Sequence, residues 1–312
     1  MKILFIDTAH KILFSILEKA GHDCTPGYDL SRKEILEIIP QYQGAIIRSR
    51  IQADKEFFDN ATQLKFIGRV GAGMESIDVK YAESKGIACI NSPEGNADAV
   101  GEHAIAMLLS LFNNISRADR EVKSGKWIRE ANRGIELAGK TVALIGYGNM
   151  GKAFAKKLSG FDCKVIAYDK YLSNFSDQYA KEVSLEEVYL SADILSLQVP
   201  LTHETESFVN DGFINRFKKN FYLINTARGK CVNTNDLVKN LKSGKVPGAC
   251  LDTLEYEDPS FEAAADLASN LAGLNEVGDK VILSPHIAGW THESKEKLAR
   301  ILGEKIIAKF SS

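Results

Sequence analysis

Short apolar runs alternate with amphipathic stretches along most of the chain. Runs of three to five mainly apolar residues, bounded by polar residues, glycine or proline, predict buried strands. These runs are Lys2–Ile6, Gly44–Arg48, Lys65–Arg69, Gly86–Ile90, Val142–Ile145, Lys164–Tyr168, Ile194–Leu197, Phe221–Asn225, Gly248–Leu251 and Val281–Leu283. Apolar residues at helical spacing predict the helices between them, which are Ala9–Ala20, Ser31–Ile39, Val79–Lys85, Ala97–Ser124, Asp211–Lys219, Thr234–Ser243 and His292–Phe310.

The alternation of strands and helices predicts an α/β protein with parallel sheets. Asn91–Asn96 (NSPEGN) is rich in turn residues and is the best candidate for a hinge between two domains. The final helix is too short to form a domain, so we expect it to return to the first one. The expected division is residues 1–96 plus 287–312 in a discontinuous first domain, and residues 97–286 in a second domain with a six-stranded sheet.

The sequence TVALIGYGNMG places a G-x-G-x-x-G motif directly after a predicted strand and at the start of a helix. Gly146 permits the tight turn, Gly148 allows a pyrophosphate to approach the backbone, and Gly151 allows close packing of helix and strand. Asp169 follows Gly151 by eighteen residues, at the end of the next strand, where a carboxylate can bind ribose hydroxyls and repel a 2′-phosphate. This pattern predicts binding of NAD rather than NADP, although Lys170 weakens that preference. The alternative is a glycine-rich turn that binds nothing.

Composition narrows the class of protein. The 312 residues are 45% hydrophobic and 26% charged, with a net charge of −2, so no basic surface for nucleic acid or for an anionic membrane is expected. No apolar run reaches membrane-spanning length, and the N-terminus is unlike a signal peptide. The 5 cysteines are scattered, which favours reduced thiols in a cytoplasmic protein, and no group of residues has metal-ligand spacing, so we predict no metal.

Three residues suited to acid–base chemistry follow strands of the second domain. Arg228 comes after the strand at 221–225, Glu257 shortly after the strand at 248–251, and His286 after the strand at 281–283. Hydride transfer to a 2-oxo acid needs an arginine that binds the carboxylate, a histidine that exchanges the proton and a carboxylate that orients the histidine. Taken singly, each has a structural alternative, such as a salt bridge, a solvated loop or a backbone hydrogen bond. Their placement beside a dinucleotide turn favours the catalytic interpretation.

Seven stretches, in order, resemble those of the D-isomer-specific 2-hydroxyacid dehydrogenases, and the resemblance covers essentially the whole chain. They are GRVGAGMESID (68–78), NSPEGNADAVGEHAIAMLL (91–109), ELAGKTVALIGYGNMG (136–151), LQVPLT (197–202), INTARG (224–229), LDTLEYEDP (251–259) and LSPHIAG (283–289). The resemblance implies an NAD-binding Rossmann domain at 97–286 and a discontinuous, flavodoxin-like substrate domain. It also implies a homodimer and a small 2-hydroxy acid or 2-oxo acid as substrate.

The resemblance assigns roles residue by residue. Arg228, Glu257 and His286 would be catalytic. The residues implied to bind the cofactor are Gly146, Gly148, Asn149, Met150, Gly151, Asp169, Pro200, Thr205, Ala227 and Asp252, the last at the nicotinamide carboxamide. The turn from Val70 through Gly71, Ala72 and Gly73 to Met74 would offer backbone N–H groups to the substrate carboxylate.

Within the family, the phosphoglycerate dehydrogenases look closest, which implies oxidation of D-3-phosphoglycerate to 3-phosphohydroxypyruvate in serine biosynthesis. Arg69 and the loop of Arg48, Ser49 and Arg50 would hold a second anionic group, and Arg129 or Arg133 would reach a partner subunit. The chain ends at Ser312, so we expect the serine-sensing domain of some relatives to be absent. The segment 258–280 is longer than is usual in the family, and Trp290 stands where a small residue is common.

Two other interpretations remain open. One is a reductase of glyoxylate, hydroxypyruvate or another 2-oxo acid with the same fold. The other is an NAD-sensing binding protein, which the lack of a basic patch disfavours. Related formate dehydrogenases pair the histidine with glutamine, so Glu257 argues against that chemistry.

Overall fold

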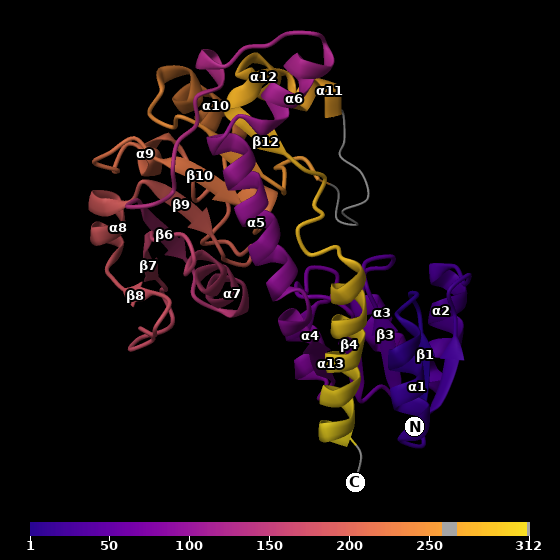
Figure 1. Cartoon of the computed structure of the whole chain (residues 1–312). Coiled ribbons are helices and arrows are strands. Elements are labelled where there is room, and N and C mark those ends of the chain that lie inside the picture. Colours follow the sequence, from indigo (N-terminus) through magenta and orange to yellow (C-terminus); the bar gives the residue numbers. More distant parts are fainter. Residues whose placement is uncertain (258–266, 311–312) are drawn as a thin grey trace. The chain divides into compact units, whose positions relative to one another are not determined.

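The computed structural model describes residues 1–257 and 267–310, which form two compact units. Among these residues, unit 1 comprises 1–96 and 290–310, and unit 2 comprises 97–257 and 267–289. Each unit has its own parallel sheet with helices packed on it (Figure 1). The predicted α/β fold with two parallel sheets is confirmed. From the sequence we expected the chain to return from the second domain to the first after His286. In the structure it leaves unit 2 after Gly289.

In the described part of unit 1, the sheet has five strands in the order β2-β1-β3-β4-β5, which is the flavodoxin-like order. The strands are β1 (Lys2–Phe5), β2 (Asp23–Pro26), β3 (Gly44–Ile47), β4 (Phe66–Arg69) and β5 (Ala88–Asn91). The helices are α1 (Lys11–Lys19), α2 (Arg32–Ile38), α3 (Lys55–Asn60), α4 (Val79–Ser84) and α13 (His292–Phe310), with short 3-10 helices at Ile39–Gln41 and Pro93–Gly95. Strand β2 was not predicted, because an edge strand of sequence DCTP carries no apolar run.

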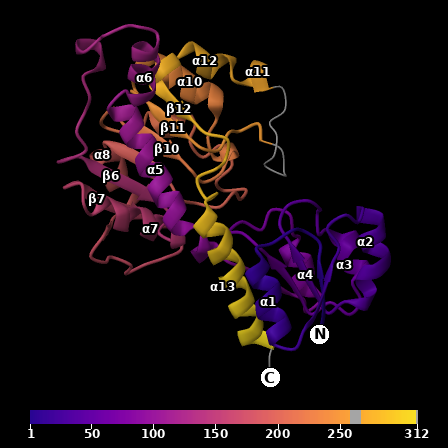
Figure 2. The ribbon, with the colours of Figure 1, turned by 45° about the vertical axis from the view of Figure 1, so that its right-hand side comes forward.

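The last helix belongs to unit 1, as the sequence led us to expect. Leu302 and Ile306 of α13 are fully buried in one apolar cluster with Ile3 and Phe5 of β1. Figure 2 shows α13 running alongside α1, and a Cβ added to Gly303 would lie 3.0 Å from Ile16. Helix α13 therefore completes the core of the unit that the first 96 residues begin.

In the described part of unit 2, the sheet has seven parallel strands in the order β12-β11-β10-β9-β6-β7-β8. The strands are β6 (Thr141–Ile145), β7 (Lys164–Tyr168), β8 (Lys181–Glu182), β9 (Ile194–Leu197), β10 (Tyr222–Asn225), β11 (Ala249–Leu251) and β12 (Val281–Leu283). The helices are α5 (Ala97–Phe112), α6 (Ile115–Lys123), α7 (Asn149–Leu158), α8 (Leu185–Ser191), α9 (Asp211–Ile214), α10 (Thr234–Ser243), α11 (Leu267–Asn270) and α12 (Ala272–Glu276), with 3-10 helices at Glu130–Asn132, Gly229–Cys231 and Gly278–Lys280. The strand beyond the six predicted is β8, whose two polar residues at the sheet edge give no apolar signal.

The long helix predicted over Ala97–Ser124 is wrong, because the chain breaks it into α5 and α6. Asn114 takes a left-handed backbone conformation with φ of 52°, which ends one helix and caps the next. Asparagine tolerates this conformation better than most residues. Helix α5 packs closely on α7, where a Cβ on Gly101 would lie 3.3 Å from the backbone of Ala153 (Figure 1).

The described residues contain neither a membrane-spanning helix nor a group of side chains that could bind a metal ion. No helix among them has the length and apolarity needed to cross a bilayer. No group of three His, Cys, Asp or Glu residues in 1–257 and 267–310 is arranged to hold a metal ion. Of the segment 258–280, which is longer than is usual in the family, residues 258–266 lie outside the described part of the chain.

Candidate active site

The glycine turn links β6 to α7 at the carboxyl edge of the unit 2 sheet. Gly146 has a φ of 98°, and a Cβ there would lie 2.4 Å from the carbonyl oxygen of Gln198, so only glycine fits. Gly148 is the N-cap of α7, and no side chain caps this helix. A Cβ on Gly148 would meet nothing within 4 Å. The N-terminus of a ten-residue helix is thus approached by open space, as an anion-binding helix end requires.

Asp169 faces this turn from the end of β7. Its Oδ2 accepts the N–H of Tyr147 at 2.8 Å, and its Oδ1 accepts those of Tyr171 at 2.9 Å and Leu172 at 3.1 Å. A carboxylate has about four acceptor positions, so these three bonds orient the group without exhausting it. The carboxylate lies where the sequence predicted a ribose partner.

Arg228 projects from a loop that Asn225 organises. The Asn225 side chain accepts the N–H of Ala227 at 3.1 Å and donates to the carbonyl of Arg228 at 2.9 Å. The Arg228 guanidinium donates to the carbonyl of Ala227 at 2.6 Å. A Cβ on Gly229 would lie 1.8 Å from the carbonyl oxygen of Leu254, so this loop packs directly on the loop after β11.

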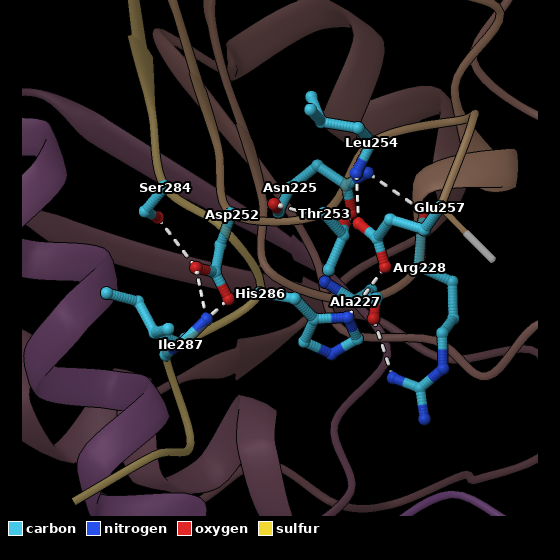
Figure 3. Close-up of polar contacts among 11 residues, drawn as sticks. Asn225, Ala227, Arg228, Asp252, Thr253, Leu254, Glu257, Ser284, His286 and Ile287 are labelled. Atoms are coloured by element: carbon cyan, nitrogen blue, oxygen red, sulfur yellow. Dashed lines mark hydrogen bonds and ion pairs between the residues drawn. The ribbon is translucent and has the colours of Figure 1, made fainter. Parts of the chain in front are cut away.

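Glu257 and His286 form a hydrogen-bonded pair. His286 Nδ1 lies 2.7 Å from Glu257 Oε2, and Glu257 Oε1 accepts the N–H of Leu254. An ionised carboxylate only accepts hydrogen bonds, so this contact assigns the ring proton to Nδ1. Figure 3 shows the His286 ring and the Arg228 guanidinium extending to the same side of their loops. The structure therefore brings the three predicted catalytic residues together.

The backbone of His286 is strained, with a φ of 54°. The N–H of His286 donates to the Asp252 carbonyl at 2.7 Å. The Asp252 carboxylate accepts the N–H groups of Ile287 and Ala288, each at 2.9 Å, and the Ser284 hydroxyl at 2.6 Å (Figure 3). Hydrogen bonds to Asp252 thus fix Ser284 before the histidine and Ile287 and Ala288 after it.

His103 of α5 completes this network, since its Nε2 lies 2.9 Å from Ser284 Oγ and 3.5 Å from Asp252 Oδ1. Burial alone would raise the pKa of Asp252, but hydrogen bonds from His103, Ser284 and the two backbone N–H groups lower it overall. Asp252 is 1% exposed. Its burial argues against the direct contact with a cofactor amide that the resemblance implied.

Two further residues expected at the cofactor, Asn149 and Met150, begin α7, and the remaining ones lie on the loops after β9 and β10. The Thr205 hydroxyl donates to the Pro200 carbonyl and accepts the N–H of Thr202, both at 2.7 Å, and so closes the turn after β9. Ala227 is buried beside Arg228. The Thr226 hydroxyl is buried and has no hydrogen-bond partner among the residues that the structure describes. Such an orphan is costly unless a ligand or water satisfies it.

Arg48 and Arg69 meet in unit 1, at the ends of β3 and β4. Arg69 Nε donates to the Arg48 carbonyl at 3.2 Å, and the Ser76 hydroxyl donates to the same oxygen at 3.2 Å. The Arg48 guanidinium lies 4.6 Å from the centroid of the Trp290 ring, which is 66% exposed. A Cβ on Gly71 would lie 2.3 Å from the Arg69 guanidinium. The two arginines are therefore held beside the glycine turn.

Arg50 is engaged differently from Arg48. Its guanidinium donates to Asp7 at 3.2 Å, to the carbonyl of Leu30 at 2.7 Å and to that of Gly27 at 3.1 Å. These contacts make Arg50 a brace within the unit, and they favour Arg48 over Arg50 as an anion ligand. Ser49 lies between them and is partly buried.

The turn at 70–73 is partly used by the chain itself. The N–H of Val70 donates to Ile47 and that of Gly71 to Arg69, each at 2.9 Å. The Ala72 carbonyl accepts from the Asn91 side chain at 2.6 Å. The N–H groups of Ala72, Gly73 and Met74 make no such bond within the described chain, which leaves them suited to an anion.

Sequence reasoning missed the residues that support the site. Asn225 could have been found, because an asparagine that ends a strand commonly bonds the backbone two residues on. His103 and Ser284 could not, because their contact joins residues 181 apart in the chain.

Comparisons with known proteins identify relatives of the chain. Residues 105–288 match the family model described as D-isomer specific 2-hydroxyacid dehydrogenase, NAD binding domain. The chain is 34% identical to a D-3-phosphoglycerate dehydrogenase of Archaeoglobus fulgidus over 98% of this chain and 57% of that protein. It is 36% identical to a hydroxypyruvate reductase of Thermotoga maritima over 89% of this chain and 88% of that protein. The crystal structure of D-lactate dehydrogenase with NAD+ from Lactobacillus jensenii is 26% identical and superposes with a TM-score of 0.80, covering 99% of this chain and 96% of that one.

Proposed function

Because the chain belongs to the D-isomer specific 2-hydroxyacid dehydrogenase family, we propose that it oxidises a D-2-hydroxy acid, or reduces the matching 2-oxo acid, with NAD. The chain spans 57% of the length of the Archaeoglobus protein. The proposal therefore rests on residues of this chain. The observation that carries the proposal is the contact of 2.7 Å between Glu257 and His286 in a loop that packs beside Arg228.

The chemistry assigned to the chain is binding and proton transfer. Glu257 holds the proton on His286 Nδ1, so the exchange with the substrate hydroxyl falls to Nε2. Glu257 also stabilises the imidazolium that forms when the hydroxyl loses its proton. Arg228 binds the substrate carboxylate and polarises the oxygen at C2. Bound NAD would supply the acceptor for the hydride at C2.

The residues present fit a dinucleotide. The open approach to Gly148 and the uncapped N-terminus of α7 suit a pyrophosphate. Asp169 suits the ribose hydroxyls, and the orphan hydroxyl of Thr226 supplies an unused polar group beside Arg228. Pro200, Thr205 and Ala227 would line the same region.

We propose D-3-phosphoglycerate as the substrate. The Arg69 guanidinium lies beside Gly71 and bonds the Arg48 carbonyl, and the Arg48 guanidinium lies over the Trp290 ring. Guanidinium groups suit phosphate. Ala72 and Gly73 would bind the carboxylate. Oxidation would give 3-phosphohydroxypyruvate and would place the protein in serine biosynthesis. The name of the Archaeoglobus relative, D-3-phosphoglycerate dehydrogenase, supports this choice of substrate.

A second candidate is reduction of hydroxypyruvate or glyoxylate. The Thermotoga hydroxypyruvate reductase is similar over 88% of its own length, compared with 57% for the phosphoglycerate dehydrogenase. Arg48 also has a partner within the chain, since its guanidinium stacks on the Trp290 ring. The two candidates share the catalytic residues and differ in the role of Arg48.

The test compares substrates side by side. NADH formation with D-3-phosphoglycerate at alkaline pH, with product removed, is measured beside oxidation of NADH and NADPH with hydroxypyruvate and glyoxylate. Arg48→Ala should raise KM at least tenfold for the phosphorylated substrate and leave the others within twofold. Arg300→Ala, which loses an exposed ion pair to Glu296, is the control. Turnover with only the unphosphorylated acids would exclude the phosphoglycerate assignment, and near-normal rates in both Arg228→Ala and His286→Ala would exclude the dehydrogenase.

We further propose a homodimer. Large apolar side chains are exposed along residues 115–135 of unit 2, and Trp127 is 80% exposed. The others are Ile115, Val122, Ile128 and Ile135. A cluster of this kind marks an interaction surface. The resemblance to the family implies that this segment contacts a partner subunit, where Arg129 or Arg133 would reach the active site of that subunit. Light scattering on the wild type and on Trp127→Glu tests it: a wild-type monomer would exclude the dimer.

A further inference from the structure

The loops that follow β7 and β9 are joined by one carboxylate. Glu204 Oε1 lies 2.6 Å from Lys170 Nζ, and Glu204 Oε2 accepts the Tyr171 hydroxyl at 2.6 Å. Strands β7 and β9 are the two neighbours of β6 in the sheet. The bridge from Glu204 to Lys170 and Tyr171 therefore spans the carboxyl end of β6, where the glycine turn begins.

Both ends of this bridge stand on braced turns. On one side, the Thr205 hydroxyl closes the 200–205 turn through Pro200 and Thr202. On the other, the Asp169 carboxylate accepts the N–H groups of Tyr171 and Leu172. A contact between braced turns costs less conformational entropy than one between mobile loops. Glu204 raises the pKa values of Lys170 and Tyr171 through hydrogen bonds, and the same bonds lower its own pKa.

The charges of the bridge bear on the cofactor. Asp169 marks the expected position of the adenosine ribose, and Lys170 is the cation next to it in the chain. A lysine at this position can bind a 2′-phosphate as a point charge. Here Lys170 is paired with Glu204. The carboxylates of Asp169 and Glu204 together carry two negative charges against the one positive charge of Lys170.

We infer that Glu204 selects NAD against NADP: it keeps Lys170 occupied and adds a second carboxylate beside Asp169, so that a dinucleotide with a 2′-phosphate is rejected. The inference rests on the proposed binding of NAD. It makes Glu204 a third determinant of the choice between NAD and NADP, in addition to the glycine motif and Asp169. Exposed ion pairs are weak, so we expect the effect of Glu204 to be about tenfold in relative affinity rather than absolute.

The test is equilibrium binding of NAD+ and NADP+ to the full chain by titration calorimetry. Glu204→Gln should lower the Kd of NADP+ about tenfold and change that of NAD+ less than twofold. Glu206→Gln removes the same charge from the same turn, where Glu206 is exposed, and should leave both Kd values unchanged. Adding Lys170→Met to Glu204→Gln should remove most of the gain, because the lysine is then no longer present to bind the phosphate.

The outcomes separate the inference from the function on which it rests. Wild-type protein that binds neither dinucleotide overturns both. Wild-type protein that binds NAD+, with a Glu204→Gln variant no better at binding NADP+, overturns the role of Glu204 alone. An equal gain in Glu206→Gln, or a gain that survives the loss of Lys170, also overturns it.

Discussion

Replacing Asp252 by asparagine should destabilise unit 2 and misplace His286. The carboxylate accepts hydrogen bonds at both oxygens, with Ser284 and Ile287 at Oδ1 and Ala288 at Oδ2. An amide of the same shape has one acceptor oxygen, so in either orientation its NH2 group faces a buried N–H donor. A buried donor left unsatisfied costs about 1–3 kcal/mol. We therefore expect Asp252→Asn to lose about 1–3 kcal/mol, which lowers Tm by roughly 2–10 °C.

The pH dependence of this loss has a definite sign. The pKa of Asp252 is lower in the folded chain than in the unfolded one. Its contribution to stability is therefore present above the unfolded pKa of about 4 and disappears as the pH falls through the folded value. The difference between wild type and Asp252→Asn should be constant at neutral pH and should shrink below about pH 4.

Urea unfolding at several pH values measures the difference, with Asp119→Asn as control. Asp119 carries an exposed pair with Lys123, and its loss should change the free energy of unfolding by less than about 0.5 kcal/mol. Because the network fixes the strained backbone of His286, Asp252→Asn should also lower kcat by about ten- to a hundredfold while changing KM less. A variant within about 0.5 kcal/mol of wild type, with unchanged kcat, would refute the role given to Asp252.

Three further outcomes are expected. Gly148→Ala should keep the Tm of the wild type, because the added Cβ meets nothing within 4 Å, and should weaken NAD+ binding in calorimetry at least tenfold. Gly229→Ala should unfold at much lower urea, because its Cβ would lie 1.8 Å from the Leu254 carbonyl; near-wild-type unfolding would contradict the close packing of those loops. Trp290→Ala removes the stacking on Arg48, worth about 0.5–2 kcal/mol, and should raise KM for D-3-phosphoglycerate about two- to tenfold without changing kcat. An unchanged KM would show that the stacking does not prepare Arg48.

The features predicted well from the sequence were those encoded over short stretches. The apolar runs gave the central strands of both sheets, and the glycine motif gave the turn between β6 and α7. The edge strands β2 and β8 were missed, because their residues are polar and are paired on one side only. The break at Asn114 was missed because the apolar pattern of α5 continues up to it.

The site divides in the same way. Arg228, Glu257 and His286 could be found because each follows a strand, and parallel strands bring their carboxyl ends to one edge. The distinction between Arg48 and Arg50 could not, since both leave the same strand. The two arginines differ only in their contacts in the structure: Arg48 stacks on Trp290, and Arg50 forms an ion pair with Asp7.

Asp252 serves the site through the backbone that it holds. His286 must leave β12 in a conformation that costs about 1–3 kcal/mol, and a strained residue persists only where its surroundings hold it. Asp252 supplies that hold from the next strand, through its carbonyl on His286 and its carboxylate on the two residues that follow. Glu257 comes from the same loop and binds the ring of the same histidine. Since β11 and the loop after it thus set both the backbone and the ring of His286, changes in that loop should alter catalysis more than changes around β12 itself.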